Sequence, residues 1–213
     1  MSSTAYGSGV IAADVRAFVR GNLAPPPARV LEVGAGEGDL ANALRVAGYD
    51  VLAIDPDPRG DGVSAIALQD LEDSVGPFDA AVAIVSLHHV DPLDASCARI
   101  AAVLRPGATL IVDEVDIGVY DERAAAWWLQ QRRALGAQTD KTPDAMVAEL
   151  RDHLHPLERI AAALDGGFEV GPPLRGPYLY RWYLNESLRP AEEDLIARGE
   201  LPAVGARLLA HRR

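Results

Sequence analysis

One segment reads Val30-Leu31-Glu32-Val33-Gly34-Ala35-Gly36-Glu37-Gly38-Asp39-Leu40. A β-rich apolar run leads directly into glycines at alternate positions, and an amphipathic segment then runs to Val46 and closes at Gly48. This order predicts a strand, a tight turn and the start of a helix. Such a turn holds a ligand of the nucleotide type against bare backbone and a helix N-terminus.

The glycine spacing narrows the class of ligand. A dinucleotide fingerprint needs a small residue where Asp39 stands, and an acidic side chain there is bulky and repels a pyrophosphate. This disfavours a dehydrogenase, and no Gly-Lys-Ser/Thr follows that would make a phosphate-binding loop. S-adenosylmethionine carries an adenosyl group, an ammonium and a sulfonium but no phosphate. It suits the acidic Glu32, Glu37 and Asp39, and is therefore the predicted cofactor.

Composition limits the remaining classes. The chain has 213 residues, of which 49% are apolar, which predicts one domain spanning residues 1–213. The net charge of −11 argues against nucleic acid or an anionic membrane as a partner. Cys97 is the one cysteine, so no internal disulfide forms. Without a signal-peptide pattern or an apolar span of membrane length, a cytoplasmic protein is expected, as a monomer or homodimer.

Strands and helices alternate after the glycine segment. The run at residues 78–85 is almost continuously apolar, as in a parallel strand covered on both faces. The other segments are strands at 50–54, 63–68 and 108–112 and a helix at 93–104. Repeated β-α units predict an α/β fold with a parallel sheet and helices on both faces.

Polar residues follow the predicted strands at the edge where ligands bind in such sheets. Asp55, next to Pro56, ends the second strand, where a carboxylate can accept hydrogen bonds from both ribose hydroxyls. Asp70 follows the third strand and can accept from an adenine amino group, or it can cap the short segment 71–75.

Histidines supply the candidates for proton transfer. His88 and His89 follow Ser86 and Leu87 at the end of the central strand, and imidazole transfers protons near neutral pH. The alternative is that each merely orients its loop. His153, His155 and Glu114, which lies at the end of the fifth strand, are further candidates for the base. His153 and His155 have no defined third ligand nearby, so no metal is predicted.

These segments together resemble the class I S-adenosylmethionine-dependent methyltransferases, in their small-molecule branch. The resemblance covers about 85 residues, and it rests on the glycine segment, Asp55, Gln69-Asp70-Leu71, Phe78-Asp79-Ala80-Ala81-Val82, Leu87-His88-His89-Val90 and Leu104-Arg105-Pro106-Gly107-Ala108. It implies a Rossmann-like sheet of seven mostly parallel strands, with the last strand antiparallel. It further implies that Gly34, Ala35 and Gly36 approach the methionine part, that Asp55 holds the ribose, and that Asp70 with Leu71 frames the adenine. Glu32, Pro56 and Ser86 complete the expected cofactor site.

The remaining segments predict a helical cap on a cofactor-binding core of about residues 28–114. The cap would comprise residues 8–22, 118–165 and 177–199, with helices at 121–135, 143–154, 156–164 and 190–198. The final strand is expected at 203–210, with 178–184 as the alternative. Trp127, Trp128 and the aromatics of 177–184 would roof the site, or else pack as core.

The sequence therefore predicts transfer of a methyl group from S-adenosylmethionine to a small acceptor, apolar or aromatic because of the roof. His88, His89, His155 and Glu114 are the candidate catalytic residues. A non-catalytic protein of the same fold that binds the cofactor, as a sensor or an assembly partner, is the alternative.

Overall fold

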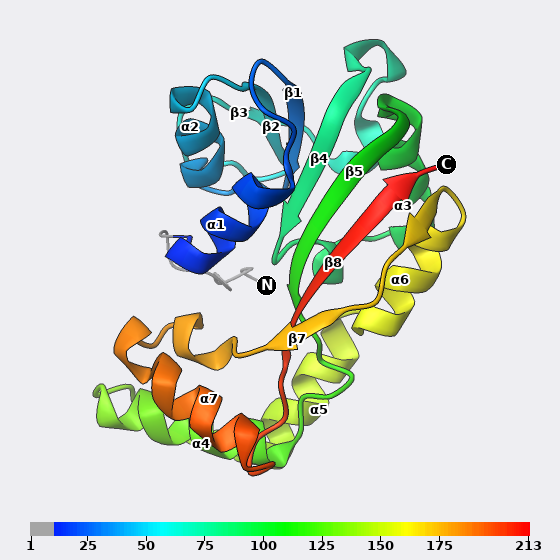
Figure 1. The fold of residues 1–213 in the computed structure, drawn as a ribbon. Helices are drawn as coiled ribbons and strands as arrows, with labels where there is room; N and C mark the ends of the chain where they lie inside the picture. Colours follow the sequence, from blue (N-terminus) through cyan, green and yellow to red (C-terminus); the bar gives the residue numbers. More distant parts are fainter. Residues whose placement is uncertain (1–10) are drawn as a thin grey trace.

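A mixed sheet of eight strands forms the centre of the computed structural model, which describes residues 11–213 (Figure 1). The strand order is β3-β2-β1-β4-β5-β8-β6, and β7 pairs with β8. The strands are β1 (Arg29–Val33), β2 (Asp50–Asp55), β3 (Val63–Ala65), β4 (Phe78–Ile84), β5 (Leu104–Val115), β6 (Phe168–Val170), β7 (Leu174–Gly176) and β8 (Gly205–Arg212). β1 to β5 pair in parallel, whereas β8 runs antiparallel to β5, β6 and β7. The predicted α/β class is confirmed, and the strand beyond the expected seven is the three-residue β7.

Helices cover both faces of this sheet. The helices of the described chain are α1 (Ala13–Asn22), α2 (Asp39–Val46), α3 (Leu93–Val103), α4 (Glu122–Ala134), α5 (Pro143–His153), α6 (Leu157–Asp165) and α7 (Arg189–Ala197), of which α1, α2, α3 and α6 pack on the sheet. One apolar cluster joins α1 and α2 to the sheet, and another joins α3 and α6 to its opposite face. Ala80 and Val82 of β4 belong to the first cluster, Ala81 and Ala83 to the second. Burial on both faces explains why β4, apart from Asp79, is apolar without alternation.

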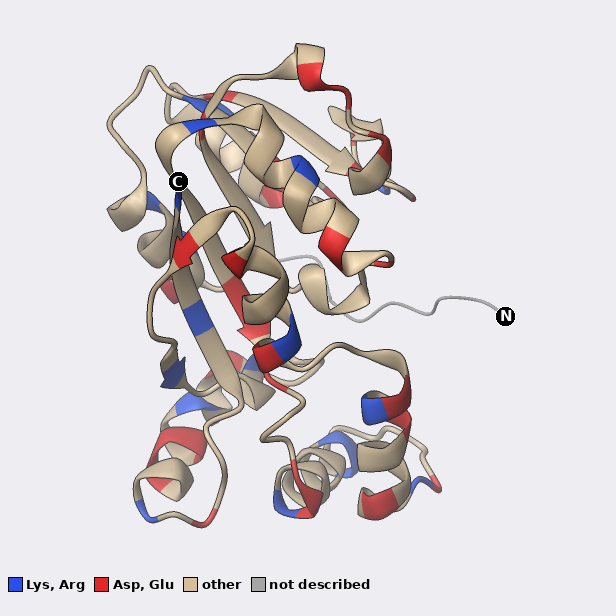
Figure 2. Ribbon diagram, turned by 90° about the vertical axis from the view of Figure 1, so that its right-hand side faces the viewer, with Lys and Arg blue, Asp and Glu red and all other residues tan. Residues whose placement is uncertain are grey.

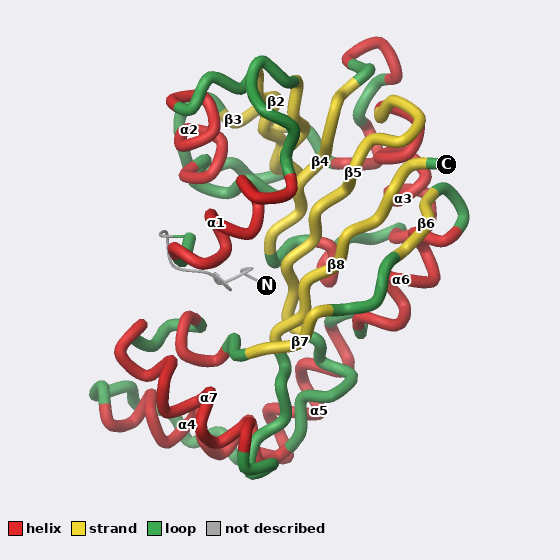
Figure 3. The backbone as a smooth tube through the Cα atoms, in the orientation of Figure 1, coloured by secondary structure: helices red, strands yellow, loops and turns green. Residues whose placement is uncertain are grey.

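The cap, comprising α4, α5, α7 and the turns near them, lies beyond the lower ends of the parallel strands (Figures 1 and 2). Tyr120, Leu129 and Trp182 belong to its own apolar cluster, separate from the two clusters on the sheet. Lys and Arg as well as Asp and Glu occur on its helices (Figure 2). β7 pairs with the start of β8 where the sheet meets the cap (Figure 3).

The last strand settles one open alternative. β8 pairs along its length with β5, so that Ile111 lies opposite Leu209, and Ala206, Leu208 and Ala210 are buried on one face. The preferred location of the final strand is thus confirmed, although β8 runs from residue 205 to residue 212 and not from 203 to 210. The alternative at 178–184 is wrong, because the chain there forms the 3₁₀ turn Leu179–Arg181.

Other boundaries differ for local reasons. β3 ends at Ala65 instead of continuing to residue 68, because the chain turns at Leu68–Asp70 and buries Leu68 in the core. β5 begins four residues earlier than predicted and α1 begins at Ala13, while residues 8–10 of the expected cap lie outside the described residues. In residues 11–213 no helix combines the length and apolar character needed to span a membrane.

Candidate active site

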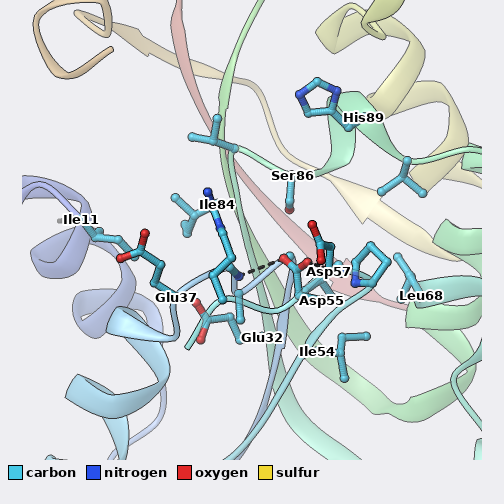
Figure 4. Close-up of a pocket in the computed structure, with 18 of the residues that line it drawn as sticks. Ile11, Glu32, Glu37, Ile54, Asp55, Asp57, Leu68, Ile84, Ser86 and His89 are labelled. Carbon is cyan, nitrogen blue, oxygen red and sulfur yellow. Dashed lines mark hydrogen bonds between the residues drawn. The ribbon is translucent and has the colours of Figure 1, made fainter. Parts of the chain in front are cut away.

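A cavity of about 550 Å³ opens at the carboxyl ends of β1, β2 and β4 (Figure 4). The strand order reverses between β1 and β4, and ligands of open α/β sheets bind at such a switch point. Its volume is in the range of small-molecule sites. Seven residues predicted to bind the cofactor are in its wall: Glu32, Gly34, Ala35, Gly36, Asp55, Pro56 and Ser86.

The glycine loop lies directly against the next loop of the cavity. Gly34 has φ +71°, and a Cβ built on it would lie 2.4 Å from the Cβ of Ser86, so that only glycine fits. The backbone N–H groups of Gly34 and Ala35 donate to the carbonyl of Ile54 at 2.9 and 3.0 Å. These bonds fix the loop to the end of β2, where Asp55 follows.

Asp55 braces the loop as well as facing the cavity. Its Oδ2 accepts a hydrogen bond from the Gly36 N–H at 2.9 Å, and its Oδ1 accepts one from the Asp57 N–H at 2.9 Å (Figure 4). Each carboxylate oxygen has two lone pairs, so both retain capacity to accept from a ligand hydroxyl. Asp57 is also in the wall, and its position two residues after Asp55 was a signal available in the sequence.

The turn after β3 differs from the prediction. Neither Asp70 nor Leu71 is in the cavity wall: Asp70 is exposed and Leu71 is buried in the core. The wall is formed instead by residues 66–69, including Leu68 and Gln69. Because β3 ends three residues early and a 3₁₀ turn follows, the residues that face the cavity come earlier in the chain.

His88 and Glu114 form a buried pair behind the cavity. The His88 side chain is 1% exposed, and its Nδ1 makes a short hydrogen bond to Glu114 Oε2. Glu114 Oε1 accepts from the backbone N–H groups of Ser86 and Leu87 at 2.9 and 2.7 Å. Neither residue is in the wall of the large cavity. Their contacts hold the turn Leu87–His89 in place.

His89 is the predicted base that does reach the cavity wall (Figure 4). Burial disfavours the charged form of His89, and the neighbouring His88 repels it. Together these two effects lower the pKa of His89 to about 4. The two rings are 4.2 Å apart between centroids. His89 is therefore neutral near pH 7, with a nitrogen lone pair that can accept a proton.

His153 and His155 lie away from the cavity wall. The His155 ring donates through Nε2 to the carbonyl of Val90 at 3.1 Å, and its backbone N–H donates to the His88 carbonyl at 2.9 Å. His153 is exposed and bonds to the Glu149 carbonyl. His155 thus fastens the junction of α5 and α6 to the histidine turn. No three potential metal-binding side chains cluster within residues 11–213.

The cap supplies one wall that the sequence analysis only partly anticipated. Tyr178, Arg181 and Trp182, from the turn Leu179–Arg181 and its flanks, line the cavity. Trp127 and Trp128 do not; they pack on the cap cluster, where Trp128 Nε1 donates to the Trp182 carbonyl at 2.7 Å. The aromatic roof is therefore made by the turn and not by the paired tryptophans of α4.

A buried carboxylate also fastens this turn. Glu192 of α7 is fully buried and accepts hydrogen bonds from the backbone N–H groups of Tyr178, Leu179 and Tyr180 at 2.8 to 2.9 Å. Burial raises the pKa of Glu192, while the three N–H donors oppose that rise. No sequence motif distinguished this glutamate from the exposed acids beside it on α7.

Unpaired polar atoms gather at the cavity. Within the described part of the chain, four buried side-chain atoms lack a hydrogen-bond partner: Glu32 Oε2, Ser86 Oγ, Ser96 Oγ and Arg181 Nε. Three of these four residues line the cavity, and Ser96 is the exception. An unsatisfied buried polar group is costly, so its concentration in one cavity indicates a polar ligand.

Glu32 is a strongly perturbed carboxyl in the cavity wall. It is the penultimate residue of β1, just before the glycine loop, and is only 3% exposed. Burial raises the pKa of Glu32 to about 8, and Asp39 and Asp55 add to the rise. A ligand cation beside this carboxyl would favour its charged form, which fits the ammonium of S-adenosylmethionine.

Comparison with known proteins identifies the family of this chain. A family model described as a methyltransferase domain matches residues 8–145. The chain is 36% identical over 117 residues to a ubiquinone biosynthesis O-methyltransferase of Xanthomonas campestris, a match that spans 46% of this chain and 48% of that protein. The chain thus spans about half the length of the curated relatives it matches.

Two solved structures show the same fold over most of the chain. An S-adenosylmethionine-dependent methyltransferase of Mesorhizobium loti covers 94% of this chain and 98% of its own, with a TM-score of 0.59 at 18% identity. A 1,6-didemethyltoxoflavin N1-methyltransferase of Burkholderia thailandensis, solved with S-adenosylhomocysteine, covers 87% and 71%, with a TM-score of 0.52 at 18% identity. The chain belongs to the methyltransferase-domain family, and its fold is that of the class I S-adenosylmethionine-dependent enzymes.

Proposed function

We propose that this chain transfers a methyl group from S-adenosylmethionine to a small-molecule acceptor that is apolar or aromatic. The observation that carries the proposal is Glu32, a buried carboxyl with an unpaired oxygen at the glycine loop of a methyltransferase fold. The printed names of the relatives, one assigned to ubiquinone biosynthesis and one to 1,6-didemethyltoxoflavin, support a small acceptor. We further propose a cytoplasmic monomer or homodimer. The net charge of −11 supports the proposal that the protein binds no nucleic acid or anionic membrane.

The residues of the cavity fit the proposed cofactor. Glu32 would bind the ammonium, the backbone of residues 34–36 would contact the methionine part, and Asp55 would accept from the ribose hydroxyls. Leu68 and Gln69 would flank the adenine in place of Asp70 and Leu71. When bound, S-adenosylmethionine supplies an electrophilic methyl group on its sulfonium. The protein then has to align an acceptor and exclude water.

The chain also offers a group to take the acceptor's proton. His89 is neutral near pH 7 and lies in the wall, and His88 and Glu114 fix the turn that carries it. An imidazole with a lowered pKa is a weak base, which suits an acidic hydroxyl such as a phenol or catechol better than an alcohol. His88 and Glu114 are therefore proposed as positioning residues, and His155 as a structural one.

Calorimetric titration with S-adenosylmethionine, S-adenosylhomocysteine and NAD tests the cofactor. We expect the first two to bind, and Asp55→Asn to weaken both by about tenfold or more, since it removes a charged acceptor that also braces the loop. Asp70→Asn is the matched control, because it changes an exposed acid outside the cavity and should leave the affinity unchanged. Binding of NAD in preference would exclude the proposal.

Turnover distinguishes an enzyme from a binding protein of the same fold. The protein is mixed with S-adenosylmethionine and a panel of phenols and catechols, and release of S-adenosylhomocysteine is measured. We expect release that depends on an acceptor and falls at least about tenfold in His89→Gln. Tight cofactor binding without methyl transfer to any acceptor would favour the non-catalytic alternative.

A further inference from the structure

Arg181 is the cation at the cap side of the cavity. Its side chain is 14% exposed and extends from the turn Leu179–Arg181 into the wall formed with Tyr178 and Trp182. Within the described part of the chain, Arg59 is the other Lys or Arg in the wall. Arg59 belongs to the opposite side: its N–H donates to the Gly36 carbonyl at 3.0 Å, and its Nη2 would be 3.3 Å from a Cβ at Gly36.

Two contacts fix the Arg181 guanidinium in place. Its Nη2 donates to Asp113 Oδ1, and its Cζ lies 4.5 Å from the centroid of the Tyr178 ring. The other oxygen of Asp113 accepts from Arg207 Nε at 2.9 Å. One buried carboxylate is thus shared between two guanidinium groups, and Asp113 keeps a cationic partner if Arg181 is replaced.

The Nε–H of Arg181 is buried without an acceptor. A guanidinium presents its donors in a planar fork that matches a carboxylate, and a buried donor gains most when the acceptor is charged. The same turn brings Tyr178 and Trp182, whose rings offer an apolar wall beside the charge. Tyr178 and Trp182 also adjoin His88 at a smaller gap in the protein, so the cap turn borders the histidine turn.

From this arrangement we infer that Arg181 recognises a carboxylate carried by an aromatic methyl acceptor. The inference rests on the proposed function and adds a specificity to it. The cofactor also has a carboxylate, at its methionine end, but Arg59 already provides a cation at the glycine loop. Arg181 is therefore assigned to the acceptor, and its contact with Asp113 serves to orient it.

Binding to the protein saturated with S-adenosylhomocysteine tests the assignment. The probes are benzoate, 4-hydroxybenzoate, 3,4-dihydroxybenzoate and 2-naphthoate, each paired with its carboxamide, and tryptophan fluorescence and calorimetry report binding. The native protein should bind acids at least about tenfold more tightly than their amides, because the charged acceptor satisfies Arg181. Arg181→Met should abolish this preference, and Arg181→Lys should restore part of it by keeping the charge without the fork.

Arg189→Met is the matched control. Arg189 pairs with Asp14, which also pairs with Arg207, the second partner of Asp113. Arg189 is absent from the cavity wall, so the variant should keep the preference for acids. Circular dichroism and thermal unfolding verify that each variant folds. Affinities for S-adenosylhomocysteine and for methylthioadenosine, which lacks the amino-acid part, should change less than about twofold in Arg181→Met, since its charge serves the acceptor.

Three results would overturn the inference. Equal binding of acids and amides by the native protein, or binding of neither, removes the carboxylate site. Loss of affinity for S-adenosylhomocysteine but not methylthioadenosine in Arg181→Met assigns the residue to the cofactor. If the native protein binds no S-adenosylhomocysteine, the proposed function fails as well. If cofactor binding and turnover are intact but the acid preference is missing, only the inference fails.

Discussion

The glycine-loop side and the cap side of the cavity are built by different means. On the first side, backbone does most of the positioning: Gly34 and Ala35 bond to the carbonyl of Ile54, and Gly34 leaves no room for a Cβ. On the second, side chains do it: Arg181 stacks on Tyr178 and pairs with Asp113. The wall proposed to hold an invariant cofactor is thus fixed by the main chain, while the wall proposed to face a variable acceptor is set by exchangeable side chains.

Gly34→Ala, on the glycine-loop side, should produce the largest loss of cofactor affinity. The added Cβ would meet Ser86 at 2.4 Å in a backbone conformation that alanine rarely adopts, so affinity for S-adenosylhomocysteine should fall at least about 100-fold. Gly136→Ala is the matched control, since Gly136 has φ +86° with nothing within 4 Å of the built Cβ. It should cost about 1 kcal/mol in stability and leave binding intact. Equal loss of affinity in both variants would contradict the steric argument.

Glu192→Gln tests the second side. Losing the carboxylate leaves at least one of three buried N–H donors without its acceptor, and the free energy of unfolding should fall by about 2 kcal/mol. Denaturant unfolding measures the loss. Binding of aromatic probes should weaken, while that of S-adenosylhomocysteine changes little. If only the affinity for S-adenosylhomocysteine fell, the two sides of the cavity would not be separable.

Glu32→Gln should change the pH dependence of cofactor binding. With the pKa of Glu32 raised to about 8, the free protein holds a proton there at pH 7, and a cationic ligand must displace it. The affinity of the native protein should therefore rise up to about tenfold per pH unit between pH 6 and 8. Calorimetry in buffers of different ionisation enthalpy should detect the released proton. In Glu32→Gln the release should vanish and the affinity stay low.

The raised pKa of Glu32 also predicts how the stability of the protein depends on pH. Because the folded-state pKa of Glu32 lies above its ordinary value of 4.5, the folded protein binds this proton more tightly than the unfolded chain. Its contribution to stability is therefore lost as the pH rises from about 4.5 to 8. Glu32→Gln should remove that part of the decline, and urea unfolding at pH 5 and pH 8 checks it. If the stability of Glu32→Gln fell more steeply with pH than that of the native protein, Glu32 would not be the cause of the decline.

Trp128→Phe should produce the smallest effect. It removes the hydrogen bond from Nε1 to the Trp182 carbonyl, at 2.7 Å, and should cost about 1 kcal/mol in thermal or denaturant unfolding. Since Trp128 is not in the cavity wall, affinity for S-adenosylhomocysteine should stay constant. A large loss of cofactor affinity would mean that the cap transmits strain to the glycine loop.

The difference between the two sides also explains what could be predicted from the sequence. The glycine loop and Asp55 follow from residue types at fixed local spacing, which short-range sterics determine. The antiparallel β8 was expected only from the resemblance to a known family, because its pairing with β5 joins distant parts of the chain. Asp70 was misplaced because one 3₁₀ turn shortened β3 and shifted the face of the chain. The position of such a turn depends on which apolar residue is buried in the core, which here is Leu68. The local sequence pattern does not determine that residue.

Arg181 and Glu192 could not be identified from the sequence for a different reason. Both act through residues distant in the chain: Arg181 through Asp113, 68 residues away, and Glu192 through the backbone of a turn 12 to 14 residues earlier. Before the fold is known, each is one charged residue among many. Only tertiary packing reveals that one faces a cavity and the other is fully buried.

The bonds from Glu192 have a consequence for redesigning the protein. They hold the turn by its main chain, through the N–H groups of residues 178–180, and do not depend on which side chains those residues carry. Substitutions at Tyr178, Arg181 and Trp182 can therefore alter the mouth of the cavity without removing these hydrogen bonds. A library confined to these three positions offers a compact route to new acceptor preferences, with Glu192 kept constant as the anchor.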